Sequence, residues 1–416
     1  MRFDTQTATT TAATWASEPA WHGVPAYDPA TLGADGLLVW CAHPDDETLG
    51  VGGLIAEAHR RSLPVHVVAA TGDEQRLREL RAAIAILHPD AAVSSLGLPD
   101  GSLHDHQRAV ADAVEATLAA YPGRVILTPW SEDRHGDHRT LGQLVRSIAT
   151  DRGRRCLSYP VWLWQWGEPA DVPWSDLMVV PLDDEILDRK QRALAQHVSQ
   201  LTGPHPVLSA ELLQNARLPR EVLILEPTSA DRHFEKLHAA SPDPWRVESR
   251  WYETRKRNLV MATLPRDRYD SVLELGCSTG VMTRDLAERA GRLLAVDGSL
   301  SAVSRARDRT RFLTNTRVER MRLPEQWPQG RHDLVVASEL GYYFDAHQWR
   351  ALCAHLVSSL APDGEVIACH WTGDASDFRQ SGRDAHLLLA EAIGHPADIR
   401  HVDDDFVIEL FRKTTT

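Results

Sequence analysis

Residues 37–47 read LLVWCAHPDDE, and residues 271–280 read SVLELGCSTG. Each stretch begins with a short apolar run of the kind that forms a buried parallel strand, and a helical pattern follows it. The first run stops at a His-Pro-acidic turn, and the second stops at a turn that contains two glycines. Strand–turn–helix units in such alternation are typical of α/β layers around parallel sheets. The sequence therefore predicts two α/β domains, one begun by each stretch.

The alternation continues along the chain on both sides of a Pro- and Ser-containing stretch near residue 228. Strands are expected at 65–70, 125–128 and 293–296, and helices at 52–61, 76–87, 139–149 and 243–259. The expected organisation is a flexible leader over residues 1–25, a first domain over 26–228, a linker over 229–240 and a second domain over 241–416.

The composition of the 416-residue chain limits its class of partner. Hydrophobic residues make up 43% and charged residues 25%, with a net charge of −13. Such a chain lacks the bulk positive charge that neutralises phosphates, which argues against a nucleic-acid partner. No apolar run approaches the roughly 20 residues of a membrane span. The 5 cysteines form no CxxC pair, which indicates a reducing, cytoplasmic compartment. The sequence leaves the oligomeric state open.

Two short motifs in the first half carry metal-binding side chains. His43-Pro44-Asp45-Asp46-Glu47 follows one expected strand, and His135-Gly136-Asp137-His138 follows another. Ligands of open α/β sheets bind beyond the carboxyl ends of the strands, so the two loops are expected to converge. Two histidines and one aspartate with an open fourth position are a catalytic-zinc arrangement. The alternative interpretation is a helix-capping turn and a solvated loop.

Taken together, the two motifs resemble those of the PIG-L/LmbE family of zinc-dependent N-deacetylases, over about residues 35–225. The family removes acetyl groups from N-acetylglucosamine-containing substrates, and the resemblance implies a Rossmann-like layer fold. It also implies a zinc ion, with iron as the alternative metal. The implied roles are metal ligands for His43, Asp46 and His138, general base for Asp45, electrophilic or acid partner for His135, and orientation of a histidine for Asp137.

Further residues are candidates for contacts with a sugar substrate. By the same resemblance, Arg76 holds the sugar and Asp100 grips its hydroxyls, although a surface ion pair or a turn is the alternative for both. The tract 162–166 reads WLWQW. Strand alternation would place its three indoles, Trp164 among them, on one face that suits stacking on a sugar. The alternative for this tract is a core strand or an interface.

The second glycine-containing loop predicts a different cofactor. Gly276 and Gly280 let the backbone pass close to a ligand, and Asp297 ends the next strand, where an acid can bind ribose hydroxyls. The loop lacks the G-x-G-x-x-G pattern of a dinucleotide site. Its E-x-G-x-x-x-G pattern resembles class I S-adenosylmethionine-dependent methyltransferases, which have a doubly wound sheet with an antiparallel edge.

Additional motifs occur between about residues 233 and 412: Asp243-Pro244-Trp245, Trp251-Tyr252-Glu253, residues 338–343 (SELGYY) and His370-Trp371. Together with the Glu274–Gly280 loop, they resemble the NodS-like family of N-methyltransferases that act on deacetylated chitooligosaccharides. For the donor, S-adenosylmethionine, the resemblance implies contacts from Glu274, Gly276, Cys277 and Gly280, from Asp297 on the ribose, from Met321, Arg322 and Leu323 near the adenine, and from Tyr252 on a lid helix.

The acceptor side of this site offers Glu339, Tyr342, Tyr343 and His370. Either Glu339 or His370 could accept a proton from an amine. The alternative for His370 is a buried strand end, and for the tyrosines it is packing.

One hypothesis unites the two halves. An acetamide nitrogen is a poor nucleophile because its lone pair is delocalised into the carbonyl. Removal of the acetyl group exposes the amine that an N-methyltransferase requires. We therefore expect a bifunctional enzyme that deacetylates a small-molecule amino sugar or glycoside and then methylates the amine. The alternatives are an uncoupled methylation of an oxygen or another acceptor, and a binding protein with one inactive domain.

Overall fold

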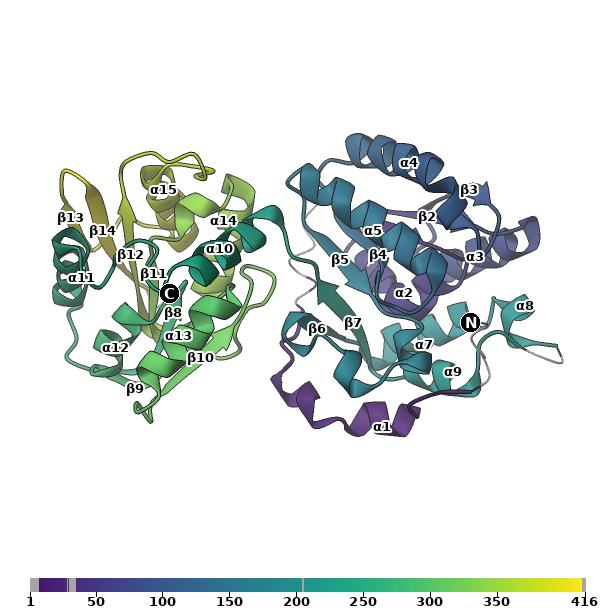
Figure 1. Cartoon of the computed structure of the whole chain (residues 1–416), viewed down its shortest axis with the longest axis horizontal. Coiled ribbons are helices and arrows are strands. Elements are labelled where there is room, and N and C mark those ends of the chain that lie inside the picture. Colours follow the sequence, from purple (N-terminus) through teal and green to yellow (C-terminus); the bar gives the residue numbers. More distant parts are fainter. Residues whose placement is uncertain (1–6, 28, 30–34, 204–205, 414–416) are drawn as a thin grey trace. The chain divides into compact units, whose positions relative to one another are not determined.

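The computed structural model describes residues 7–27, 29, 35–203 and 206–413. The chain divides into two compact units, Met1–Ser229 and Ala230–Thr416, and Figure 1 labels their elements. Each unit is built on one sheet of seven strands, which confirms the predicted α/β fold with two Rossmann-like domains. Among the described residues, no helix combines the length and the apolarity needed to cross a bilayer.

In the first unit the sheet order is β3-β2-β1-β4-β5-β7-β6. The first five strands are parallel, whereas β7 is antiparallel to both β5 and β6. The strands are β1 (Leu37–Cys41), β2 (Val65–Thr71), β3 (Ala92–Leu98), β4 (Val125–Pro129), β5 (Cys156–Tyr159), β6 (Leu177–Pro181) and β7 (Arg220–Leu225). The longer helices are α2 (Asp46–Arg60), α3 (Glu74–Leu87), α4 (Gln107–Ala120), α5 (Gly136–Asp151) and α7 (Asp184–Leu194). The shorter ones are α1 (Ala12–Ser17), η1 (Pro19–Gly23), η3 (Leu103–His106), α6 (Leu163–Trp166), η4 (Pro169–Asp171), η5 (Trp174–Asp176), α8 (Val198–Leu201) and α9 (Ala210–Ala216).

Side-chain alternation along β1 explains why this sheet lies between two layers of helices. Leu37, Val39 and Cys41 pack into the cluster that α2, α3 and α7 complete on one face. Leu38 and Trp40 pack into the cluster that α4 and α5 complete on the other. Since successive strand residues point to opposite faces, an all-apolar run is what a sheet covered on both sides requires.

The second unit has the sheet order β10-β9-β8-β11-β12-β14-β13, with β14 antiparallel to β12 and β13. This is the doubly wound sheet with an antiparallel edge that the sequence predicts. Its strands are β8 (Tyr269–Leu275), β9 (Ala290–Asp297), β10 (Thr316–Arg320), β11 (His332–Ser338), β12 (Leu360–Trp371), β13 (Ile399–Val402) and β14 (Phe406–Arg412). Its helices are α10 (Ser229–Ala240), α11 (Trp251–Thr263), α12 (Val281–Ala287), α13 (Leu300–Thr310), η6 (Gly341–Tyr343), α14 (Ala346–Ser358) and α15 (Gly382–Ile393).

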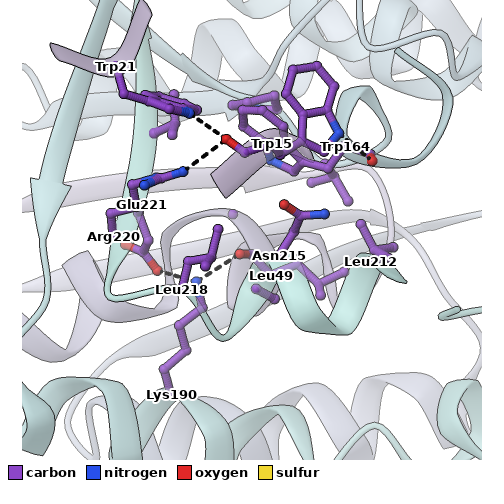
Figure 2. A pocket seen from close by; sticks show the side chains of 15 residues that line it. Trp15, Trp21, Leu49, Trp164, Lys190, Leu212, Asn215, Leu218, Arg220 and Glu221 are labelled. Carbon is purple, nitrogen blue, oxygen red and sulfur yellow. Dashed lines mark hydrogen bonds and ion pairs between the residues drawn. The ribbon is translucent and has the colours of Figure 1, made fainter. Parts of the chain in front are cut away.

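The prediction of a flexible leader over residues 1–25 is wrong for the part that the structure describes, which contains helix α1. Residues 1–6 lie outside the described part. Trp15 on α1 is fully buried, and its Nε1 donates to the Trp164 carbonyl oxygen at 3.0 Å. The Ala12 amide donates to Glu211 Oε2 at 2.8 Å. Figure 2 shows Trp15, Trp21 and Trp164 lining a pocket with the buried Lys190–Glu221 ion pair, whose atoms lie 2.7 Å apart. The Thr/Ala-rich composition of this segment predicted a flexible chain, but burial of the Trp15 indole holds the segment against the first unit.

Two further predictions near the domain boundary are wrong. Residues 229–240 form α10 rather than a linker, because Glu235 on this helix bonds Ser299 and Ser301 of the second unit. The helix expected over 243–259 begins only at Trp251. Before it, the Asp243 carboxylate accepts the amides of Val247 and Glu248 in a turn, which competes with helix formation.

Replacement of Trp15 by alanine tests the docking of the N-terminal segment. We expect W15A to lower the free energy of unfolding of the first unit by about 3–5 kcal/mol, because a buried indole leaves a cavity and an unpaired carbonyl. Urea titration followed by fluorescence measures the change. The matched control is W251A, whose indole is 74% exposed, and it should change stability by less than about 0.5 kcal/mol. Equal stability of the two variants would contradict the docking.

Candidate active sites

The loop that follows β1 brings an acidic and a basic side chain to the carboxyl edge of the first sheet. The His43 amide donates to Asp46 Oδ2 at 2.8 Å, which closes the turn into α2. Asp45 lies inside this turn with φ +131°, a conformation that non-glycine residues rarely adopt. Backbone strain of this kind persists where the surrounding structure fixes it, and it is common at functional sites.

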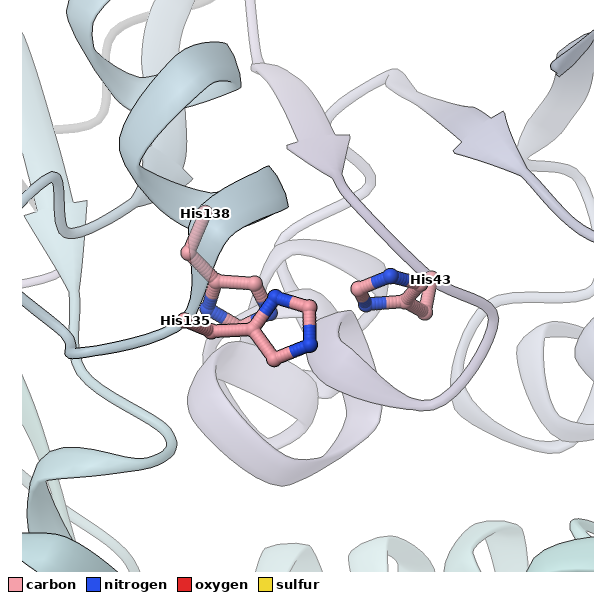
Figure 3. Close-up of side chains that lie close together, drawn as sticks. All are labelled: His43, His135 and His138. Carbon is pink, nitrogen blue, oxygen red and sulfur yellow. The ribbon is translucent and has the colours of Figure 1, made fainter. Parts of the chain in front are cut away.

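The loop that follows β4 supplies two more imidazoles from the start of α5. Figure 3 shows His135 and His138 facing His43 from the neighbouring element. The three rings each present a nitrogen, and these nitrogens lie within 4.8 Å of one another. The convergence of the two loops follows from the adjacent parallel pairing of β1 and β4.

Asp46 connects His43 and His138 and suits a metal-binding role. Its Oδ2 lies 3.5 Å from His43 Nδ1, and its Oδ1 lies 3.2 Å from His138 Nε2. His138 is fully buried, and its Nε2 has no hydrogen-bond partner, whereas its Nδ1 pairs with Asp133 Oδ2 at 2.8 Å. The contact of Nδ1 with Asp133 leaves Nε2 facing Asp46. Two imidazoles and a carboxylate, one imidazole held by an outer carboxylate, fit a zinc site.

Asp45 is buried beside this group and contacts a guanidinium. Its Oδ2 lies 3.1 Å from Arg76 Nη2. Burial raises the pKa of Asp45 to about 7, although the charge of Arg76 acts in the opposite direction. A carboxyl that titrates near neutral pH can both accept and return a proton.

His135 differs from its two neighbouring histidines in protonation. Burial, together with the charges of His138 and His43, lowers the pKa of His135 to about 4. Its Nδ1 accepts the Asp137 amide at 3.2 Å, so the neutral ring carries its proton on Nε2. The neutral ring can donate a hydrogen bond from Nε2, which suits the electrophilic role rather than the acid role among the two that the resemblance implies for His135.

Asp137, Asp100 and Arg76 surround the outer side of His43. Asp137 Oδ2 lies 3.1 Å from His43 Nε2, and the same carboxylate accepts the amides of Gly101 and Leu103. Asp100 Oδ1 lies 3.0 Å from His43 Nε2, and its Oδ2 accepts from Arg76 at 3.0 Å. The contact of Asp137 with His43 is the one expected of a residue that orients a histidine. The contacts of Asp100 and Arg76 are those expected of residues at the rim of the site. The carboxylates of Asp100 and Asp137 form with His43 a second group able to hold a cation.

In the second unit, the loop between β8 and α12 has a left-handed backbone, which favours glycine, at both of its glycines. Gly276 has φ +69° and Gly280 has φ +78°. A Cβ at Gly280 would lie 3.0 Å from Ala306 Cα. Glu274 is buried at the end of β8, where burial raises its pKa to about 8 and its carboxylate accepts from the Thr283 hydroxyl. Cys277, which lies between the two glycines in the loop, is buried.

Asp297 ends β9, the strand next to β8, and its side chain is fixed by backbone groups. Its Oδ2 accepts the Ser278 amide at 2.9 Å, and its Oδ1 accepts the Ser299 amide at 2.8 Å. The Met321 amide donates to the Asp297 carbonyl at 3.0 Å, which holds the buried segment Met321–Leu323 beside it. The ends of β8, β9 and β10 thus meet at one edge of the sheet.

A charged cluster lies at the carboxyl end of β11. Lys256 on α11 is buried, and its Nζ lies 3.0 Å from both Glu253 Oε2 and Glu339 Oε2. Glu339 has φ +56°; its Oε1 accepts the Trp371 amide, and its Oε2 accepts from the Tyr342 hydroxyl. One ammonium faces two carboxylates, so the cluster carries a surplus negative charge.

Comparisons with known proteins assign a family to each of the two units. Residues 38–149 match the family model of GlcNAc-PI de-N-acetylase (PIG-L), and residues 229–397 match that of Nodulation protein S (NodS). The chain joins a PIG-L deacetylase domain to a NodS-like methyltransferase domain. This confirms the two family resemblances found in the sequence.

Individual relatives match one domain each. Nodulation protein S of Sinorhizobium fredii (strain NBRC 101917 / NGR234) is 28% identical over 197 residues, covering 44% of this chain and 89% of that protein. The 1D-myo-inositol 2-acetamido-2-deoxy-alpha-D-glucopyranoside deacetylase of Mycolicibacterium smegmatis is 45% identical over 75 residues, covering 15% of this chain and 26% of that enzyme. The crystal structure of a putative methyltransferase from Pseudomonas syringae is 40% identical, covers 39% of this chain and 99% of its own, and has a TM-score of 0.36.

The tryptophan tract of the PIG-L domain is a helix, not the expected strand. The Asp133 carboxylate accepts the amides of Val161, Trp162 and Leu163, and this capping starts the turn that becomes α6. The ring of Trp162 stacks on that of Trp166, with their centroids 4.4 Å apart, and its centroid lies 6.2 Å from that of the His135 ring. Trp164 instead packs against Trp15 at 5.1 Å. The prediction that the tract is a strand with its three indoles on one face is therefore wrong, and the substrate contact predicted for Trp164 stays a prediction.

His370 of the NodS-like domain cannot serve as the proton acceptor considered for it. Its Nε2 accepts the Gly341 amide at 2.8 Å, and its Nδ1 lies 3.1 Å from His386 Nε2. Burial lowers its pKa well below the usual value. Glu339 remains as the candidate. Tyr342 is buried, with its ring stacked on that of Phe378 at a centroid distance of 3.9 Å, and its hydroxyl contacts Glu339. The ring of Tyr343 packs edge-on against that of Phe234, with their centroids 4.7 Å apart.

Sequence reasoning missed two residues of these sites. Asp133 holds His138 and caps α6, yet its only signal was an acid in the polar loop before His135. Lys256 holds Glu339, and its signal was the Glu253–Lys256 spacing of three residues on an expected helix. Tyr252, predicted on a lid helix, lies one turn before Lys256, and its buried hydroxyl has no hydrogen-bond partner.

Proposed function

We propose that this chain is a bifunctional enzyme that removes the N-acetyl group of an amino sugar or glycoside and then methylates the exposed nitrogen. The PIG-L domain is the metal-dependent amidohydrolase, and the NodS-like domain is the S-adenosylmethionine-dependent N-methyltransferase. The observation that carries the proposal is the group of His43, His135 and His138, whose ring nitrogens lie within 4.8 Å of one another, with Asp46 in contact with His43 and His138. Asp45 is the buried neighbour of Asp46 in the same turn.

In the deacetylation, His43, Asp46 and His138 would hold zinc or Fe(II), since two imidazoles and a carboxylate suit both ions. The bound metal would polarise the acetamide carbonyl and acidify the attacking water. Asp45 accepts a proton from that water and returns it to the nitrogen as the C–N bond breaks, which leaves acetate and a free amine. His135 donates its Nε2 proton in a hydrogen bond to the developing oxyanion. Arg76 and Asp100 bind sugar hydroxyls at the rim.

In the methylation, residues Glu274–Gly280, Asp297 and Met321–Leu323 would bind the donor, and Tyr252 would cover it. The donor supplies a methyl group activated by its sulfonium. The acceptor nitrogen attacks the methyl carbon in line as the carbon–sulfur bond breaks, so alignment is the main requirement. Glu339 orients the amine and accepts its proton, and the surplus negative charge of its cluster with Lys256 and Glu253 favours a basic acceptor over a hydroxyl.

The coupling rests on the reactivity of nitrogen. An acetamide nitrogen is a poor nucleophile because its lone pair is delocalised, so the first reaction must precede the second. Mass spectrometry of a panel of N-acetylglucosaminides incubated with the protein, zinc and S-adenosylmethionine tests this order. We expect loss of the acetyl group first, and donor-dependent methylation only of that product. Failure of the free amine to accept a methyl group would overturn the coupled function.

Metal removal separates the two activities. We expect dialysis against a chelator to abolish acetate release and to leave methylation of the free amine unchanged, because the groups able to hold a metal ion among the described residues all include His43 of the PIG-L domain. Zinc or Fe(II) added back should restore deacetylation. Colorimetric acetate release and bound-metal analysis measure the result. Loss of both activities on chelation, or of neither, would contradict the assignment.

A further inference from the structure

Helix α10 precedes the strands of the NodS-like sheet, yet one face of it contacts the residues that follow β9 and Asp297. Glu235 Oε2 accepts from the Ser299 hydroxyl at 2.8 Å, and its Oε1 accepts from the Ser301 hydroxyl at 2.6 Å. The two serines lie two and four residues after Asp297. The C-terminal end of α10 is also held, because Arg305 donates to the carbonyl oxygens of His238 and Ser241.

His238 lies three residues after Glu235 and therefore on the same face of the helix. Its side chain is 2% exposed, and its Nδ1 has no hydrogen-bond partner. The ring of Trp245 packs edge-on against the His238 imidazole, with the ring centroids 5.2 Å apart. The placement of this face beside Asp297 follows from Ser299, whose hydroxyl donates to Glu235 and whose amide donates to Asp297 Oδ1. A buried imidazole without a partner is costly unless a ligand completes its hydrogen bonds.

We propose that His238 is a donor-binding residue whose Nδ1 hydrogen-bonds the ribose or adenine of the methyl donor beside Asp297. This inference rests on the proposed methyltransferase function. It extends the proposed donor site to α10, a segment that the sequence analysis predicted to be only a linker. The chemistry that fits is a neutral imidazole, able to accept from a ribose hydroxyl or donate to an adenine nitrogen.

Isothermal titration of the full chain with S-adenosylhomocysteine and with 5′-methylthioadenosine, which lacks the amino-acid half, tests the inference. We expect H238L to weaken both ligands about fivefold, the effect of one hydrogen bond. H238N should stay within twofold of the parent chain, because its amide lies near the position of Nδ1. The matched control is H233L on the same helix, where the parent imidazole is exposed, and it should not change either affinity.

The outcomes separate this inference from the proposed function. Unchanged binding by a folded H238L, or a loss with S-adenosylhomocysteine alone, would overturn the role of His238. If H238L does not fold, H238N is compared with H238Q, whose amide lies near Nε2, and equal affinities of the two would overturn it as well. A parent chain that binds neither ligand would overturn the donor site itself.

Discussion

Replacing Asp45 by asparagine should nearly abolish deacetylation while leaving the methyltransferase reaction intact. We expect D45N to lower the rate of acetate release by about 10²–10⁴-fold, the usual contribution of a general base. Asparagine keeps the volume and the contact with Arg76 but cannot accept a proton from water. Acetate release from an N-acetylglucosaminide measures the first activity, and donor-dependent methylation of the free amine measures the second.

Two measurements keep this result specific. Bound-metal analysis should show the same content in D45N as in the parent chain, because Asp45 is not one of the three proposed metal-binding residues. D105N is the matched control: Asp105 lies in η3 near the site, and its side chain is 66% exposed, so its activity should equal that of the parent. Acetate release by D45N within tenfold of the parent would exclude Asp45 as the base.

The residues nearest the proposed chemistry could be predicted from the sequence because their chemistry requires particular types at fixed spacing. His43, Asp46 and His138 come from two loops that follow adjacent parallel strands, so the topology alone brings them together. Gly276, Gly280 and Asp297 follow from the same rule in the second unit. The carboxyl ends of such strands meet at one edge of the sheet.

The residues that support these groups could not be predicted in this way. Asp133 contacts His138 and residues 161–163, which are distant in sequence, so no local pattern marks it. Local alternation also failed for WLWQW, since the helix there starts at amides that a remote carboxylate caps. Trp15 and Glu235 likewise gain their places from contacts with residues more than 60 positions away. Tertiary contacts of this kind override composition, which is why the described part of the leader and the predicted linker both contain helices.

The charge of Glu339 should be as important to methylation as Asp45 is to deacetylation. We expect E339Q to lower the rate of methylation of a free amino sugar by about 10²-fold. The amide can keep the hydrogen bond from the Trp371 amide, but it neither attracts an ammonium group nor accepts its proton. Initial rates with S-adenosylmethionine and a glucosamine-type acceptor measure the effect, and titration with S-adenosylhomocysteine should show unchanged donor affinity.

A purely structural role for Glu339 makes different predictions, and they can be separated. Glu253 is the other carboxylate that pairs with Lys256, so E253Q is the matched control and should retain methylation within about tenfold. Raising the pH until the acceptor amine loses its proton to solvent should partly restore the rate of E339Q, because the missing base is then no longer needed. If Glu339 only holds α11 in place, a rise in pH restores nothing, and both donor affinity and thermal stability fall together. That pattern would assign the deprotonation of the amine to solvent.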